Sequence, residues 1–257
     1  MTGLPEEQVI ELAERIEDYL DGWQPARGRR REMELFDSVA AVLFYYRHNC
    51  SQDVTGVVFG VSQPTISRTV TALEEPIAAV LDCEVSELVE VICGRVVIPD
   101  GTLIPTGNRA GHRQLYSGKR HRAGAAVQIL VGTEGQLFHV GEPVAGSTHD
   151  VVAFRQTGLA DVLAEHMAEN LVIADLGYRG EPVVTPVKKS PKGEHSPAQI
   201  DANKQLSGLR AVVERCIAHL KNWKVLATGY RRPLRKLATC LAAVTALEFY
   251  RLNWTGL

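Results

Sequence analysis

Three acidic residues in distant parts of the chain could together perform metal-dependent chemistry. Asp100 and Asp175 each close a short apolar run with strand character, and Glu214 lies in an amphipathic, helical segment. Two strand ends and a helix face can bring carboxylates together, and such hard oxygen ligands bind Mg²⁺ or Mn²⁺. Two ions about 4 Å apart can activate an attacking oxygen and stabilise a leaving one. The three acids therefore predict a site that cleaves phosphodiester bonds with Mg²⁺ or Mn²⁺, using two ions.

Each acid also has a structural interpretation. An aspartate before glycine, as at Asp100, is a good turn signal, whereas Asp175 could cap a following helix. Glu214 could pair with an arginine on a solvent-exposed helix face. Asp150 opens a later helix beside His149. Asp150 is an ordinary helix-start acid favoured by the helix dipole, a residue close to the site together with His149, or a further metal ligand.

The elements that must position these acids follow from the periodicity of the apolar residues. Residues 149–169 are helical with a break at Gly158, and residues 132–135 form a hairpin turn. Strands are predicted at 95–99, 125–131, 136–140, 171–175 and 183–187, and final helices at 206–225 and 233–254. This order predicts an α/β domain in which helices flank a mixed sheet, the ribonuclease-H-like layout.

The N-terminal part contains a different pattern, two short helices around a glycine. Residues 51–81 read as a helix-turn-helix in which Gly60 supplies the turn and Ser62 caps the second helix. Ile66, Val70 and Leu73 form its core face. A plain helical hairpin is the alternative. The residues predicted to face DNA bases are Gln63, Thr65, Ser67, Arg68 and Thr71.

Length and composition fit one small and one large domain. The chain has 257 residues, 45% hydrophobic and 23% charged, as in an ordinary globular protein. We therefore expect a small all-α DNA-binding domain over residues 1–90 and an α/β catalytic domain over residues 91–257. No apolar stretch approaches the roughly 20 residues needed to span a bilayer. No signal-peptide pattern is evident, and five scattered cysteines lack a Cys-x-x-Cys pair. These features predict a cytoplasmic protein without a membrane partner.

The net charge of −2 hides an uneven distribution. The first 22 residues contain seven acids, whereas residues 101–125 contain five basic residues and no acid, and residues 204–236 contain nine basic residues and one acid. Basic stretches that flank the acids fit a path for DNA, although they could also be solvated surface. The cations predicted to contact DNA in this part are Arg113, Lys119, Arg120, Arg179, Arg210 and Lys221.

At these residues the chain resembles the DDE-superfamily transposases of bacterial insertion sequences, in the branch related to PIF/Harbinger elements. The resemblance covers roughly residues 95–226. Arg210, Glu214 and Lys221 keep the spacing of the family's helix signature, whereas Ser207 stands at its tyrosine position. The matching segments, in the family's order, are Pro99-Asp100-Gly101-Thr102, Tyr116–His121, Gly146-Ser147-x-His149-Asp150, Ala174-Asp175-x-Gly177-Tyr178-Arg179-Gly180 and Val213-Glu214-Arg215.

The resemblance implies a transposase. Such an enzyme binds the terminal inverted repeats of its element, hydrolyses phosphodiester bonds at the ends and joins the 3′-hydroxyl to target DNA, with Asp100, Asp175 and Glu214 as metal ligands. It would associate with the bacterial nucleoid and act as a homodimer or larger assembly on DNA. Two alternatives stay open. One is a catalytically silent, transposase-derived DNA-binding protein. The other is a structure-specific nuclease with the same fold, which the helix-turn-helix disfavours.

Overall fold

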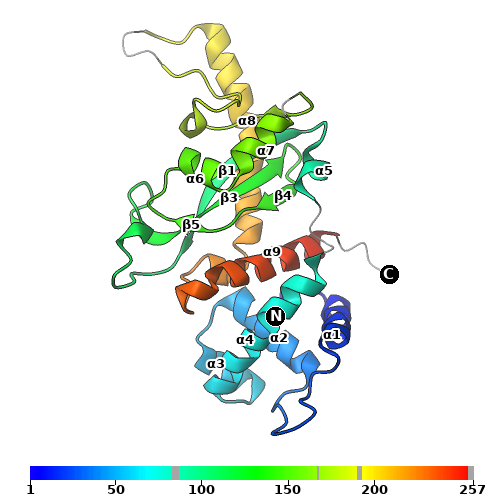
Figure 1. The fold of residues 1–257 in the computed structure, drawn as a ribbon. Coiled ribbons are helices and arrows are strands. Elements are labelled where there is room, and N and C mark those ends of the chain that lie inside the picture. Colours follow the sequence, from blue (N-terminus) through cyan, green and yellow to red (C-terminus); the bar gives the residue numbers. More distant parts are fainter. Residues whose placement is uncertain (83–86, 167, 190–192, 254–257) are drawn as a thin grey trace. The chain divides into compact units, whose positions relative to one another are not determined.

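The computed structural model describes residues 1–82, 87–166, 168–189 and 193–253, and the chain forms two compact units (Figure 1). The helical unit consists of Met1–Val85 and Leu220–Leu257, and the sheet unit of Ser86–His219. The predicted division placed everything after residue 90 in the catalytic domain. The structure instead packs the C-terminal segment with the N-terminal helices. None of the described helices is both long and apolar enough to cross a membrane.

The helical unit is built on a helix-turn-helix. Ser62 accepts a hydrogen bond from Thr65 N at 3.4 Å, and Gly60 ends the preceding helix with a φ of 69°. Ile66, Val70 and Leu73 are fully buried, as the apolar spacing predicted. The helices and 3₁₀ turns of this unit are α1 (Glu6–Leu20), α2 (Leu35–His48), α3 (Gln52–Phe59), α4 (Gln63–Val80), η4 (Lys224–Leu226), η5 (Leu234–Lys236) and α9 (Leu237–Asn253).

The C-terminal segment joins this unit because α9 is apolar along much of its surface and packs against α4. Polar contacts reinforce the packing. Within the C-terminal segment, Trp223 Nε1 donates to Glu248 Oε2 at 2.9 Å. Between this segment and α4, the buried Arg232 guanidinium pairs with the buried Glu74 carboxylate. Burying this apolar face against α4 is the main driving force. The predicted end of the last helix at Trp254 lies outside the described residues.

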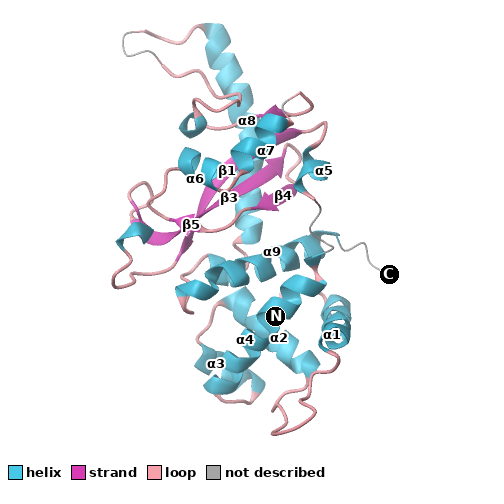
Figure 2. Cartoon of the chain, in the orientation of Figure 1, coloured by secondary structure: helices cyan, strands magenta, loops and turns pink. Residues whose placement is uncertain are grey.

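The sheet unit contains a mixed sheet with strand order β2-β3-β1-β6, to which β4 and β5 add on β3 (Figure 2). β1 pairs antiparallel with β3 and parallel with β6. The elements are α5 (Leu88–Ile92), β1 (Val96–Pro105), η2 (Arg113–Leu115), β2 (Tyr116–Ser117), β3 (Arg122–Gly132), β4 (Leu137–Val140), β5 (Val144–Ala145), α6 (Asp150–Gln156), α7 (Leu159–Glu165), β6 (Leu171–Val172), η3 (Leu176–Tyr178) and α8 (Pro197–Leu220).

Helices cover both faces of this sheet. α6 and α7 lie on one face and α8 on the other (Figure 1). Val97, Leu130 and Val172 form a core with Phe154 of α6 and Leu163 of α7. The structure thus confirms the predicted layout of a mixed sheet flanked by helices.

Some predicted boundaries were wrong. Residues 183–187 form no regular strand, and Val184 makes an isolated bridge to Ile173. The helix that carries Glu214 begins at Pro197 rather than at residue 206, and ends at Leu220 rather than at residue 225. The largest difference concerns β1, which continues through Asp100 to Pro105.

Candidate active site

Asp100 lies in the middle of β1, opposite Ile129 of β3. The expectation that the strand ends at Asp100, and the alternative that Asp100-Gly101 is a turn, are both wrong. Leu103 and Ile104 are buried and extend the strand beyond the aspartate. A mid-strand position holds the Asp100 backbone more rigidly than a strand end would, because β3 pairs with it on one side.

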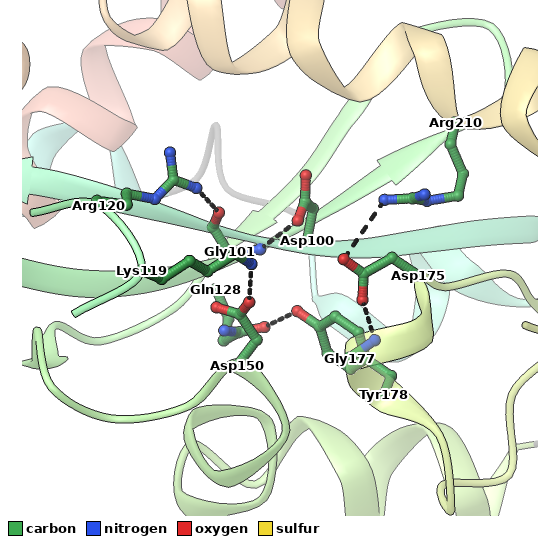
Figure 3. Close-up of polar contacts among 10 residues, drawn as sticks. All are labelled: Asp100, Gly101, Lys119, Arg120, Gln128, Asp150, Asp175, Gly177, Tyr178 and Arg210. Carbon is green, nitrogen blue, oxygen red and sulfur yellow. Dashed lines mark hydrogen bonds and ion pairs between the residues drawn. The ribbon is translucent and has the colours of Figure 1, made fainter. Parts of the chain in front are cut away.

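The parallel pairing of β1 with β6 brings Asp100 and Asp175 to the same level of the sheet. Val97 lies opposite Val172, and the same residue offset relates Asp100 to Asp175. Side chains at equivalent positions of neighbouring strands point to the same face. The two carboxylates therefore project toward the face that α8 covers, as Figure 3 shows.

Pro99 explains why the parallel ladder stops just before the two aspartates. Ile173 N donates to Val97 O at 2.9 Å. The next donor of β1 in this ladder would be residue 99, and proline has no N–H. The chain after Ile173 is therefore released from β1 and turns into η3, which places Asp175 at an edge rather than inside a continuous ladder.

Asp175 caps η3 and also faces a cation. Its Oδ1 accepts a hydrogen bond from Gly177 N at 2.7 Å, so the capping interpretation is correct. Its Oδ2 lies 3.8 Å from Arg210 Nη2 of α8. One oxygen atom is thus fixed by the backbone while the other points toward the space between the sheet and α8.

The electrostatics of Asp100 differ from those of an exposed carboxylate. Burial raises the pKa of Asp100, and the carboxylates of Asp175 and Asp150 raise it further, whereas the Gly101 N–H and the Arg210 guanidinium lower it. Arg210 Nε is itself buried and has no hydrogen-bond partner among the residues that the structure describes. The site therefore contains the Asp100 carboxylate, whose ionised form a further positive charge would stabilise. It also contains the Arg210 Nε–H, which could donate a further hydrogen bond.

Glu214 does not join the two aspartates in this structure. Its side chain is exposed, and among the described residues no group of three acids, histidines or cysteines is close enough to hold a metal ion. It lies four residues after Arg210 in α8, which is one turn along the same helix face and a rise of about 6 Å. Lys221 lies just beyond the end of α8, so it does not continue the helix face of Arg210 and Glu214.

Asp150 lies on the opposite face of β1 from Asp100. Its carboxylate lies against Gly101, where an added Cβ would come within 2.4 Å of Asp150 Oδ1. Lys119 Nζ donates to Asp150 Oδ2 at 2.6 Å, and Arg120 Nη2 donates to Gly101 O at 2.8 Å. Asp150 therefore links the loop that contains Lys119 and Arg120 to β1. It lies near the site but on the other face of the sheet from Asp100 and Asp175.

This packing predicts that Gly101→Ala destabilises the sheet unit. The new Cβ would displace the Asp150 carboxylate and its ion pair with Lys119, for a cost of about 1–3 kcal/mol typical of overpacking. Denaturant unfolding would measure the change. The control is Gly101→Ala combined with Asp150→Ala, which frees the space and should recover part of the loss. A Gly101→Ala protein as stable as wild type would contradict the close approach.

The other cations predicted to contact DNA lie on the surface of the sheet unit. Arg113, Lys119, Arg120 and Arg179 are exposed, as is His149, which directly precedes α6. A cavity of ≈ 520 Å³ is lined by Lys119, Arg120 and His149 together with Asp150. These residues form a basic rim beside β1, although no contact in the structure assigns His149 a chemical role.

The sequence interpretation missed one functional candidate, Gln128, and included its partner Tyr178 only as part of a matching segment. Gln128 of β3 lies opposite Gly101 and is buried, and Tyr178 Oη donates to its Oε1 at 2.6 Å. Burial raises the pKa of Tyr178 strongly, so this residue is a neutral hydrogen-bond donor. The pair fixes η3, and with it Asp175, against the sheet. An isolated glutamine within an apolar strand was the signal that could have indicated it.

Most of the helix-turn-helix residues that were predicted to contact DNA bases are accessible to solvent. Gln63 and Ser67 are half-buried, and Arg68 is exposed on α4. Thr65 differs, because it is 8% exposed and its hydroxyl donates to Glu32 Oε2 at 2.8 Å. Thr65 is therefore buried within the unit, where it joins α4 to the loop before α2, and its side chain, contrary to the prediction, does not face solvent.

Comparisons with known proteins agree with this architecture. Residues 99–248 match the model of the DDE superfamily endonuclease family, and residues 31–82 match the helix-turn-helix of DDE superfamily endonucleases. A protein of Streptomyces albus G, named as a candidate transposase for insertion sequence element IS112, is 28% identical over 202 residues, which are 78% of this chain and 74% of that protein. One of Microchaete diplosiphon, named as a candidate transposase for insertion sequence element IS702, is 26% identical over 238 residues, 88% of this chain and 83% of that protein. No solved structure matches the chain.

Proposed function

Because the chain belongs to the DDE superfamily of endonucleases, we propose that it is a transposase. It binds the terminal inverted repeats of its own element, hydrolyses the phosphodiester bond at each end, and joins the freed 3′-hydroxyl to target DNA. The observation that carries the proposal is that Asp100 of β1 and Asp175, which follows β6 and caps η3, both project toward the face that α8 covers, where Asp175 Oδ2 faces Arg210. The names of the two relatives point to the same activity.

The residues present fit a divalent metal ion. Asp100 and Asp175 supply hard oxygen ligands, and the raised pKa of Asp100 reflects a buried carboxylate that a cation would stabilise. Glu214 is proposed as the third ligand because it shares a helix face with Arg210, which already contacts Asp175. We propose that the metal is Mg²⁺ or Mn²⁺ and that two ions are bound. When bound, the ions would polarise the scissile phosphate and activate the attacking oxygen.

Arg210 is proposed to hold the phosphate of the strand being cut. Its buried Nε has no acceptor within the described part of the chain, and a phosphate oxygen would supply one through a charge-assisted hydrogen bond. In the absence of DNA, the ion pair with Asp175 holds the Arg210 guanidinium beside the two aspartates. Lys119, Arg120, Arg113 and Arg179 would contact neighbouring phosphates, which positions DNA without reading its sequence. Gln63, Ser67 and Arg68 of α4 would contact base edges in the major groove.

Transposition joins two ends, so we expect at least a homodimer when DNA is bound. A catalytically silent DNA-binding protein derived from a transposase is the second candidate. One observation favours it, namely that Glu214 is exposed and joined to neither aspartate.

Glu214→Gln separates the two candidates. An active transposase should lose metal-dependent cleavage of a duplex carrying the terminal repeat by at least about a hundredfold, as expected when one metal ligand is lost. Binding of the same duplex should be unchanged. The matched control is Glu194→Gln, an exposed acid of the same unit outside the site. Equal cleavage by both variants would exclude Glu214 from the metal site.

A further inference from the structure

The helical unit contains a groove beside α4 whose second wall comes from the far end of the chain. The groove has a volume of ≈ 480 Å³, and Gln63, Ser67 and Thr71 of α4 line one side. The facing side is formed by the segment that connects η4 to α9, which follows α4 by about 150 residues. The residues of this segment that line the groove are Arg231, Arg232, Pro233, Arg235 and Lys236.

Contacts to α4 and α2 hold this segment in place. The buried Arg232 guanidinium pairs with Glu74 and donates to Thr71 Oγ1 at 3.2 Å, both on α4. Upstream, Asn49 Nδ2 donates to Thr228 Oγ1 at 2.7 Å and to Gly229 O at 2.9 Å. The segment is therefore fixed at both sides of Arg231 relative to the helix-turn-helix.

The fixed segment presents positive charge to solvent. Arg231 and Arg235 are exposed, and neither has an ion-pair partner among the described residues. Lys236 Nζ lies 3.7 Å from Glu75 Oε1, which is itself exposed. Asp53 is the one acid among the residues that line the groove. Arg231 and Arg235 are thus held beside the polar residues of α4. This arrangement suits a nucleic acid, in which the phosphates contact the arginines and the base edges contact the helix.

We propose that Arg231 and Arg235 contact the phosphate backbone of duplex DNA while α4 lies in the adjacent major groove. The C-terminal segment, which the match to the helix-turn-helix family at residues 31–82 does not include, thereby completes the DNA-binding surface. The inference rests on the proposed function, because it requires that α4 binds DNA. Phosphate contacts fix the register of a reading helix and act on any sequence.

The test measures binding of the full-length protein to two labelled duplexes, one with the terminal repeat and one of random sequence, over a range of salt concentrations and with EDTA. Arg231→Gln and Arg235→Gln should each weaken binding to both duplexes roughly five- to tenfold at 0.1 M salt and reduce the slope of log K against log salt by about 0.9. Lys224→Gln is the matched control, because it removes one exposed cation of the same unit that does not line the groove. It should bind as wild type does.

The outcomes separate the inference from the proposed function. If both arginine variants bind like Lys224→Gln while Arg68→Ala impairs discrimination between the duplexes, α4 reads DNA without this segment and the inference is overturned. A loss confined to the terminal-repeat duplex would overturn the phosphate role. If the wild-type protein binds neither duplex, the inference and the proposed function both fail.

Discussion

Asp100→Asn is expected to abolish DNA cleavage and at the same time to stabilise the folded protein at neutral pH. The catalytic loss should reach at least about a thousandfold, because a bound metal contributes several kcal/mol to the transition state and asparagine is a poor substitute for a carboxylate ligand. The gain in stability follows from the pKa of Asp100, which burial raises above that of the unfolded chain. Strand cleavage and thermal unfolding of the same preparation would measure both effects.

The difference in stability between wild type and Asp100→Asn should depend on pH. A carboxyl whose folded-state pKa is raised contributes its full stability below the unfolded pKa and loses it as pH rises through the folded pKa. The stability advantage of Asp100→Asn should therefore be absent in acid and grow toward neutral pH. The proposed metal site predicts that Mn²⁺ stabilises wild type more than the variant, which narrows the difference in stability between the two proteins. A variant that is less stable than wild type at pH 7 without metal would contradict this account of Asp100.

Arg232→Met is expected to destabilise the helical unit by about 3–5 kcal/mol at neutral pH, because it leaves the buried Glu74 carboxylate without its partner. Burial already raises the pKa of Glu74, and Arg232 opposes the rise. Without the arginine the folded pKa should rise further, so the stability due to Glu74 is retained in acid and lost as pH rises. The loss should thus be smaller at pH 5 than at pH 8. Denaturant unfolding at the two pH values measures it.

The control for this prediction removes both charges. Glu74→Gln combined with Arg232→Met leaves no unpaired charge and should recover much of the loss, because buried ion pairs can often be replaced at little cost. Tyr46, which donates to Glu74 Oε1 at 3.0 Å, can donate to the glutamine oxygen instead. A double variant no more stable than Arg232→Met would show that Arg232 acts through packing rather than through its charge.

Local signals in the sequence were sufficient for the helix-turn-helix and the order of the main elements. The Ser62 cap, Gly60 and the spacing of Ile66 and Val70 each act within a few residues, so they can be read directly. The end of β1 was misjudged for the same reason. Proline, aspartate and glycine at positions 99–101 suggest a turn, but pairing with β3 and the burial of Leu103 override that local preference.

Contacts between distant residues could not be predicted. Arg232 pairs with a glutamate 158 positions earlier, and no periodicity relates the two. The same holds for Tyr178 and Gln128, and for the position of Asp150 against Gly101. The approach of Asp100 and Asp175 was predictable because both follow apolar runs, whereas the exposed position of Glu214 depends on how α8 lies against the sheet.

The most direct test is strand cleavage of a labelled duplex that carries the terminal repeat of the element encoding this chain. Wild type and Asp175→Ala would be compared with Mg²⁺, with Mn²⁺ and with EDTA. The account predicts nicking at the boundary of the repeat with either metal, no nicking in EDTA, and none by Asp175→Ala although that variant binds the duplex. Specific binding by wild type without cleavage under any metal condition would contradict it, and would identify a DNA-binding protein that has lost the endonuclease activity of its family.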